Sequence, residues 1–265
     1  MPERPKPAQS EASKQTGRGR PIVRGEILTL GLDGCRAGWI VAAWLGPGSA
    51  PRFQLLRHFS QAAVTTGDLA GARQIAIDIP IGLPDSGRRA CDLAARAALP
   101  PGARSRVFLD LRRPQIRYLP ADYPGANAWS KTDGSGLSKQ AWFILPKVAE
   151  VDSALTPEDQ TRVREVHPEV VFHRLAGGLL LPSKKTPEGR KIRLQLLAEA
   201  GLAVEAGWDR QFPRKEVQLD DLIDAAVCAL AARRILDGKA KALPLDGLAG
   251  ASGRDSRGLA MEIWA

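Results

Sequence analysis

The sequence predicts an α/β fold built on one mixed five-stranded sheet flanked by helices. Short apolar runs bounded by glycine, proline or aspartate predict five strands, three of them near the N-terminus. Longer segments with helical spacing of apolar residues follow and separate the later strands. A chain of 265 residues can bury roughly three quarters of its unfolded surface, so one domain spanning 27–265 is expected.

The first three strands are expected at residues 27–34, 38–45 and 52–59. Turns rich in glycine and proline separate them, which predicts antiparallel pairing. The run at 74–80 is too short for a helix and almost wholly apolar, as is typical of a buried central strand. A short fifth strand is expected at 162–166, after a long intervening segment.

Helical spacing predicts six helices, at 60–72, 88–99, 138–151, 168–176, 188–200 and 221–237. The last is the clearest, because Asp220 precedes it and Gly238 follows it as a stop signal. Residues 100–135 are rich in proline, glycine and arginine and are too long for an ordinary connection. We expect a long central insertion or a functional loop there.

The charge balance favours an anionic partner. Lysine and arginine number 38 against 29 acids, a net charge of +9, which favours nucleic acid or nucleotides. Residues 1–26 carry six bases and three acids among Pro, Ser, Gly and Gln, so a disordered basic tail is expected. No apolar run approaches the ~18 residues that span a bilayer, which argues against a membrane. Three scattered cysteines fit a reducing compartment, so the cytoplasm is expected.

Two of the predicted strands end in an aspartate whose face of the strand carries small residues. Side chains alternate along a strand, so Asp33 shares its face with Gly31, and Asp78 shares its face with Ala76. The helix at 221–237 offers a matching face of acids and small residues, made of Asp221, Asp224, Ala225 and Cys228. If this helix packs against that side of the sheet, four acids converge.

Converging carboxylates repel one another unless a cation neutralises them. Hard oxygen ligands suit Mg²⁺ or Mn²⁺, and two such ions about 4 Å apart can activate water and stabilise a leaving oxygen. Asp33, Asp78, Asp221 and Asp224 are therefore candidate metal ligands and catalytic residues. Simpler roles stay open, since Asp221 could cap its helix, and Asp33 and Asp78 could be turn or strand-end acids held by local hydrogen bonds.

A second acidic group lies at 165–169, where a strand gives way to a helix with proline at its first position. Glu165 or Glu169 could act as a further metal ligand, and Glu169 and His167 are candidate catalytic residues. The alternatives are that Glu169 only favours the helix N-terminus and that His167 is a structural histidine.

Clustered bases predict contacts with phosphates. The candidate substrate-binding residues are Lys184, Lys185, Arg104, Lys139 and Arg190. The two lysines lie in a loop, where contact with a nucleic-acid backbone is favoured, whereas the helical bases Lys191 and Arg193 fit a solvated helix face.

Several ordered motifs together resemble an uncharacterised bacterial family of domains of unknown function, predicted to be nucleases with an RNase H-like fold. The matching segments are 31–39, 77–84, 104–108, 137–141, 165–169, 183–186, 220–225 and 261–264. The resemblance covers about residues 27–264. One departure is Arg106, which stands where a serine is expected.

The resemblance implies a site and an activity. RNase H-like domains carry an aspartate on the first strand, an acid on the fourth and another on the last helix. Asp33, Asp78 and either Asp221 or Asp224 match these positions, and resolvase-like members favour Asp224, which precedes alanine. The implied activity is hydrolysis of DNA or RNA with Mg²⁺ or Mn²⁺. A non-catalytic nucleic-acid or protein-binding module stays open, as does an ATPase-like nucleotide-binding protein, although Cys35 and Arg36 stand where that fold usually has Thr or Ser.

Overall fold

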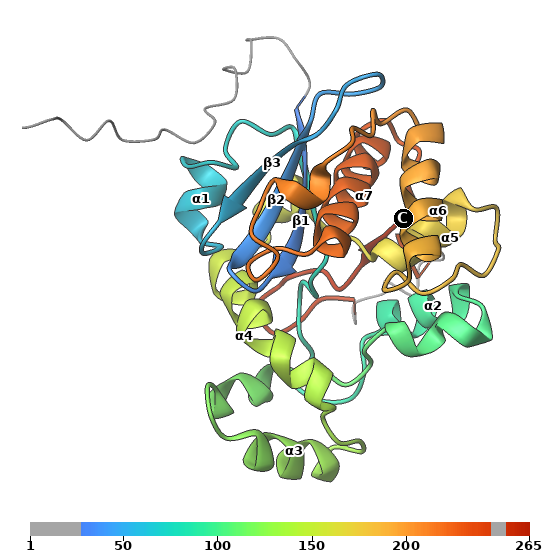
Figure 1. Ribbon diagram of the computed structural model, residues 1–265. Coiled ribbons are helices and arrows are strands. Elements are labelled where there is room, and N and C mark those ends of the chain that lie inside the picture. The colour runs from blue at the N-terminus through green and yellow to red at the C-terminus, as the bar shows by residue number, and fades with distance from the viewer. Residues whose placement is uncertain (1–27, 245–252) are drawn as a thin grey trace, which may run out of the picture.

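A mixed sheet lies at the centre of the computed structural model, which describes residues 28–244 and 253–265 (Figure 1). Its strands are β1 (Thr29–Cys35), β2 (Gly38–Trp44), β3 (Arg52–Leu56), β4 (Gln74–Ile77) and β5 (Val163–Glu165). They lie in the order β3-β2-β1-β4-β5, with β1, β2 and β3 antiparallel and β4 and β5 parallel to β1. The predicted five-stranded mixed sheet is confirmed. The basic tail predicted at 1–26 lies outside the described residues.

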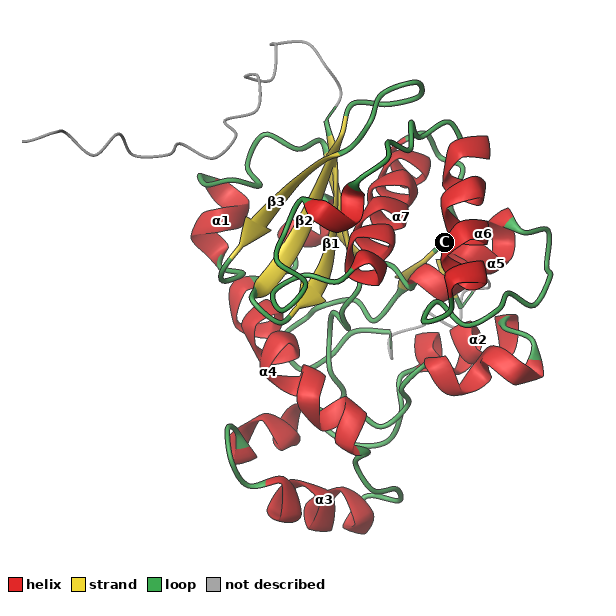
Figure 2. Ribbon diagram, in the orientation of Figure 1, coloured by secondary structure: helices red, strands yellow, loops and turns green. Residues whose placement is uncertain are grey.

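Helices cover both faces of the sheet (Figure 2). They are α1 (Gln61–Thr65), α2 (Ala90–Ala98), α3 (Tyr123–Thr132), α4 (Lys139–Ala154), α5 (Pro168–Leu175), α6 (Pro187–Glu199) and α7 (Leu219–Leu236). Four 3₁₀ helices are η1 (Pro101–Arg106), η2 (Arg113–Tyr118), η3 (Asp159–Thr161) and η4 (Trp208–Arg210), and β6 (Ala242–Leu243) pairs with β7 (Ile263–Trp264). Among the described residues no helix combines the length and the apolar character needed to cross a membrane.

The predicted first helix needs correction. The helix expected at 60–72 is only five residues long, because the chain turns at Gly67 and continues in turns to β4. The long insertion expected at 100–135 contains η1, η2 and α3. The buried guanidinium of Arg112 holds this insertion together by donating to the carbonyl oxygens of Gly87, Ser130 and Ser135, each at 3.1 Å.

The close packing of α7 on the sheet depends on a missing side chain. A Cβ atom at Gly31 of β1 would lie 2.0 Å from the backbone nitrogen of Ala229 and 2.1 Å from the carbonyl oxygen of Ala225. Thr29 donates a hydrogen bond from Oγ1 to the Ala229 oxygen at 3.2 Å. The small residues predicted on this face of α7 therefore let the helix lie directly against β1.

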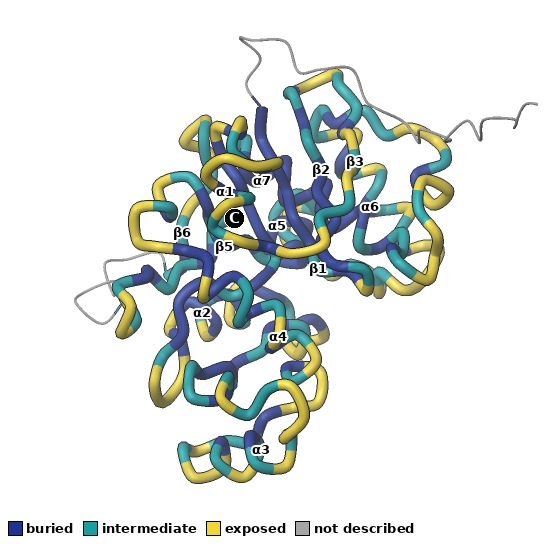
Figure 3. Tube along the Cα trace, turned by 90° about the vertical axis from the view of Figure 1, so that its left-hand side faces the viewer, coloured by how far each residue is buried: buried dark blue, intermediate teal, exposed yellow. Residues whose placement is uncertain are grey.

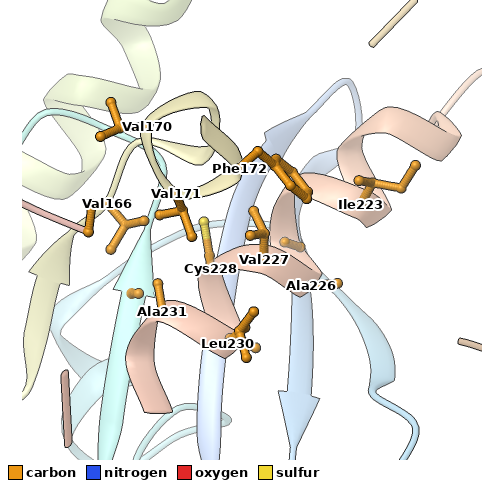
Figure 4. Close-up of a cluster of buried hydrophobic side chains, with 14 of the residues drawn as sticks. Val166, Val170, Val171, Phe172, Ile223, Ala226, Val227, Cys228, Leu230 and Ala231 are labelled. Carbon is orange, nitrogen blue, oxygen red and sulfur yellow. The ribbon is translucent and has the colours of Figure 1, made fainter. Parts of the chain in front are cut away.

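The sheet separates two hydrophobic cores. On one side Val171 and Phe172 of α5 lie over Val227 and Cys228 of α7 (Figure 4). On the other, alternate residues of β1 such as Leu30 pack in a core with residues of α1 and α4. The central strands and α7 are buried along most of their length (Figure 3). Both cores fix the edge of the sheet at which the acids lie.

Candidate active site

Three aspartates come together from separate elements of the structure. Asp33 lies near the end of β1, Asp78 directly follows β4, and Asp224 lies in the second turn of α7. Because β1 and β4 are parallel and Leu32 pairs with Ile77, Asp33 and Asp78 leave the sheet at the same edge. The packing of α7 against β1 brings Asp224 to that edge.

The electrostatics show that these carboxylates act on one another. Burial raises the pKa of Asp33 well above its usual value, and the charges of Asp78 and Asp224 raise it further. Burial and then Asp224 raise the pKa of Asp78 to about 7. Burial also raises the pKa of Asp224. Ionised, the three form a cluster of like charge in which Asp33 and Asp224 are buried, an arrangement that is unfavourable without a cation.

Asp221 has a different role from Asp224. Its Oδ2 accepts a hydrogen bond from the backbone N–H of Gln218 at 2.8 Å, which closes the N-terminus of α7 as a capping box. Burial raises its pKa to about 6. The helix-cap alternative for Asp221 therefore has a direct structural counterpart, and Asp224 is the acid of α7 that shares the cluster.

Lys184 supplies the one ammonium group in this cluster. Its Nζ contacts Asp224 Oδ2, while the other oxygen, Oδ1, is buried without a hydrogen-bond partner. Burial by itself would lower the pKa of Lys184, but the charges of Asp224, Asp33 and Asp78 outweigh it and raise the pKa. One lysine thus stands against three carboxylates. The next residue, Lys185, contacts Asp220 at the start of α7.

The donor set has the chemistry of a hard-cation site, but it is not assembled around an ion. Carboxylate oxygens are the ligands that Mg²⁺ and Mn²⁺ prefer, and the free Oδ1 of Asp224 together with excess negative charge favours a further cation. Within 28–244 and 253–265, no group of three or more His, Cys, Asp or Glu residues is positioned to hold a metal ion. The ammonium group of Lys184 contacts one oxygen of Asp224 in this arrangement.

Both glutamates of the 165–169 segment are bound to arginines. Glu165 accepts hydrogen bonds from Arg89 Nη2 at 2.6 Å and from the backbone N–H of Ile81 at 2.7 Å. Burial raises the pKa of Glu165 to about 8, although Arg89 opposes the shift. Glu169 accepts bonds from Arg193 at 2.9 and 3.0 Å and from Arg106 at 2.6 Å.

Arg193 and Arg106 balance the charge of Glu169. Burial would raise the pKa of this carboxyl, but the two guanidinium groups outweigh burial and lower it. A carboxylate that already pairs with two guanidinium groups is a poor ligand for a metal ion. The geometry therefore favours a role for Glu169 in positioning Arg106.

Arg193 is wholly buried. The prediction that it lies on a solvated helix face is therefore wrong.

His167 presents one nitrogen without a partner. Its Nε2 lies 3.3 Å from the carbonyl oxygen of Arg106, to which it donates, so Nδ1 carries the lone pair. Nδ1 is buried and has no hydrogen-bond partner. Burial lowers the pKa of His167, which favours the neutral imidazole. Near neutral pH the imidazole is therefore uncharged, with the lone pair of Nδ1 free to accept a hydrogen bond.

A pocket of about 590 Å³ lies beside these groups, and of the three clustered aspartates Asp33 and Asp78 line it. Its polar lining includes Asp33, Asp78, Glu165, His167, Glu169 and Lys184 from the predicted set. It also contains Arg106, Gln140, Phe143 and Lys147, which the sequence did not single out as site residues. Gln140, Phe143 and Lys147 lie on α4 at helical spacing. This spacing could have identified them from the sequence as neighbours on one helix face.

The remaining predicted substrate-binding residues lie apart from this pocket, except Lys185, which lines it. Arg104 is exposed and donates from Nε to the Leu99 carbonyl at 3.1 Å. Arg190 donates to the Lys185 carbonyl at 2.9 Å. Lys139 is exposed at the first turn of α4. These three could meet only a ligand that extends beyond the pocket.

Comparison with known proteins places the chain in a family. A family model described as "Protein of unknown function (DUF429)" matches residues 31–247. The chain belongs to this family. The matched span contains all three clustered aspartates, Lys184 and His167. No curated protein and no solved structure matches the chain.

Proposed function

We propose that this member of the DUF429 family is a metal-dependent nuclease with an RNase H-like fold, which hydrolyses phosphodiester bonds of DNA or RNA. The observation that carries the proposal is the cluster of Asp33, Asp78 and Asp224 around the ammonium group of Lys184, in which Asp33 and Asp78 line the pocket and Asp224 contacts Lys184. Such a cluster costs stability, and strongly shifted acids in a cleft mark functional sites more often than structural ones. The strand order and the positions of the acids support the fold assignment.

Asp33, Asp78 and Asp224 would hold Mg²⁺ or Mn²⁺, which when bound supplies an activated water and stabilises the leaving oxygen. In this proposal the side chain of Lys184 adopts two positions, one in the metal-free protein and one when metal is bound. Without metal it neutralises Asp224, and once displaced its ammonium group can meet a phosphate oxygen at the pocket. His167 can take up a proton at Nδ1, and Glu169 holds Arg106 so that its guanidinium faces the same anionic substrate.

Nucleic acid as the substrate is supported by charge. The chain carries a net charge of +9, and four bases, Arg106, Lys147, Lys184 and Lys185, line the pocket beside the acids. The side chain of Lys185 is 65% exposed and can leave Asp220 for a phosphate at little cost. Phosphate contacts of this kind supply most of the affinity of proteins for nucleic acid.

A second candidate is a nucleic-acid-binding module that works without metal. The contact of Lys184 with Asp224 favours it, because an ammonium group already occupies one carboxylate oxygen of the cluster. In that case the acids serve to hold Lys184 in the pocket, and phosphates bind to the neighbouring bases.

Cleavage of labelled single-stranded and duplex DNA and RNA in Mg²⁺, Mn²⁺ or EDTA tests the proposal. We expect cleavage with either metal, none in EDTA, and loss of cleavage in Asp33→Asn, Asp78→Asn and Asp224→Asn. The control Asp209→Asn replaces an exposed aspartate on η4 and should cleave like the wild type. Binding without cleavage in every condition would support the second candidate, and equal cleavage by all variants would overturn the site.

A further inference from the structure

Two faces of helix α4 contact different parts of the protein. Ala141, Leu145 and Val148 are buried in the core beneath the sheet. A second stripe, Gln140, Phe143, Ile144 and Lys147, lines the pocket that contains the acids. These four residues follow the i, i+3, i+4, i+7 spacing of one helix face. One wall of the pocket is therefore formed by four neighbouring residues on a single face of α4.

Phe143 is unusual on this strip because its ring is open to solvent. The residue is 73% exposed, the highest value among the large hydrophobic residues exposed in the described part of the chain. Val107 and Phe108, which follow η1, add further apolar surface to the same pocket. Together with Val107 and Phe108, the Phe143 ring gives this pocket an apolar part beside its charged groups, which a ligand can cover.

Lys147 joins this strip of α4 to the acid-bearing strand. Lys147, one turn after Phe143, donates from Nζ to the Gly38 carbonyl at 2.6 Å. Its side chain also fills the space above Gly34, where a Cβ would lie 2.6 Å from Lys147 Cδ. Gly34 directly follows Asp33, so the strip that carries Phe143 contacts the strand that carries this acid, and both residues line one pocket.

We propose that Phe143 is a stacking platform for the base of an unpaired nucleotide, so that the substrate class is single-stranded nucleic acid. The inference rests on the proposed function, because it places the phosphodiester beside the acids and the base on α4. In a duplex the faces of the bases are stacked on one another, so only an unpaired base can lie on Phe143. The four bases that line the pocket, Arg106, Lys147, Lys184 and Lys185, favour an anionic ligand over an apolar peptide.

Fluorescence-anisotropy binding in EDTA tests this stacking. The probes are a single-stranded DNA, a single-stranded RNA and a duplex of one sequence, and an abasic strand with the same number of phosphates. Base–aromatic stacking predicts that Phe143→Ala weakens binding of both single strands about 5- to 150-fold, with no change for the abasic strand. Phe143→Trp should retain wild-type affinity. The matched control is Leu179→Ala, which removes an exposed apolar side chain, 68% exposed, outside this pocket, and should bind like the wild type.

The outcomes separate the two proposals. If the wild type binds single strands and Phe143→Ala binds them equally well, the stacking platform is wrong while nucleic-acid binding stands. Preference for the duplex over the single strands also overturns it. Equal weakening of the abasic strand would show that Phe143 acts without a base and would overturn the proposal as well. If the wild type binds none of the probes, the proposed function fails together with the inference. A difference between DNA and RNA affinities would identify which of the two single strands the pocket prefers.

Discussion

Replacing Asp78 with asparagine should stabilise the metal-free protein against unfolding, and more so as the pH rises. The pKa of Asp78 is raised to about 7 in the folded state, from a reference value of 3.8. Between these two values the folded state binds more protons than the unfolded state, so the free energy of unfolding falls as the pH increases. Asparagine does not ionise, so the free energy of unfolding of Asp78→Asn does not fall with pH for this reason.

The size of the effect follows from the pKa shift. One pKa unit corresponds to about 1.36 kcal/mol, so the full shift from 3.8 to about 7 corresponds to about 4 kcal/mol. Part of this stability is lost below pH 5, and the wild type loses the remaining part, about 3 kcal/mol, between about pH 5 and pH 8.5. Asp78 is partly accessible to solvent, which screens its charge, so we expect about 2 to 3 kcal/mol. The stability of Asp78→Asn relative to the wild type should rise by this amount over that range.

Urea unfolding in EDTA at several pH values measures this difference. The control Asp209→Asn, with its exposed side chain, should follow the pH dependence of the wild type. Saturating Mg²⁺ should narrow the gap between wild type and Asp78→Asn at alkaline pH, because a ligand that binds only the folded protein stabilises it. Parallel stability curves for wild type and Asp78→Asn in EDTA would refute the reasoning.

Three further predictions follow from other contacts. Lys184→Met should lower the free energy of unfolding in EDTA by about 1–3 kcal/mol, less than a fully buried pair because this side chain is 33% exposed; in thermal melts, Mg²⁺ should stabilise the variant more than the wild type, and an equal or smaller response would count against the displacement of Lys184. Gly31→Ala forces a methyl group into the backbone of α7 and should cost several kcal/mol in urea unfolding, whereas Gly71→Ala, which faces open space, should not; similar losses at both would contradict the packing account. Lys185→Ala should reduce the slope of log affinity against log salt by roughly 0.7 to 0.9 for any oligonucleotide, and an unchanged slope would exclude a phosphate contact.

The sheet was predictable from sequence because its central strands β1, β2 and β4 are mostly apolar runs bounded by turn residues. The strand at 74–80 needed no partner information, since a short apolar run that is stopped by Pro80 fits a central strand, and its residues Gln74–Ile77 are all buried in the structure. The insertion was harder to predict, because its helices are short and begin at prolines such as Pro101 and Pro124. Its order depends on Arg112, whose carbonyl partners are scattered over nearly fifty residues of sequence.

The acids of the site could be found from strand alternation and helical spacing, but their counter-charges could not. The contact of Lys184 with Asp224 joins residues 40 positions apart, and that of Arg193 with Glu169 joins residues 24 apart. Neither follows a local period. The choice between Asp221 and Asp224 likewise depended on the capping hydrogen bond to Gln218, which only the folded helix shows.

A crystal structure of the protein soaked with Mn²⁺ tests the central claim most directly, because the anomalous signal of manganese locates the ion independently of the protein. We predict an ion bound by carboxylate oxygens of Asp33, Asp78 and Asp224, with the ammonium group of Lys184 moved away from Asp224. Asp224→Asn soaked in the same way should show no ion there. A wild-type structure without manganese at this position, in which Lys184 still contacts Asp224, would contradict the claim.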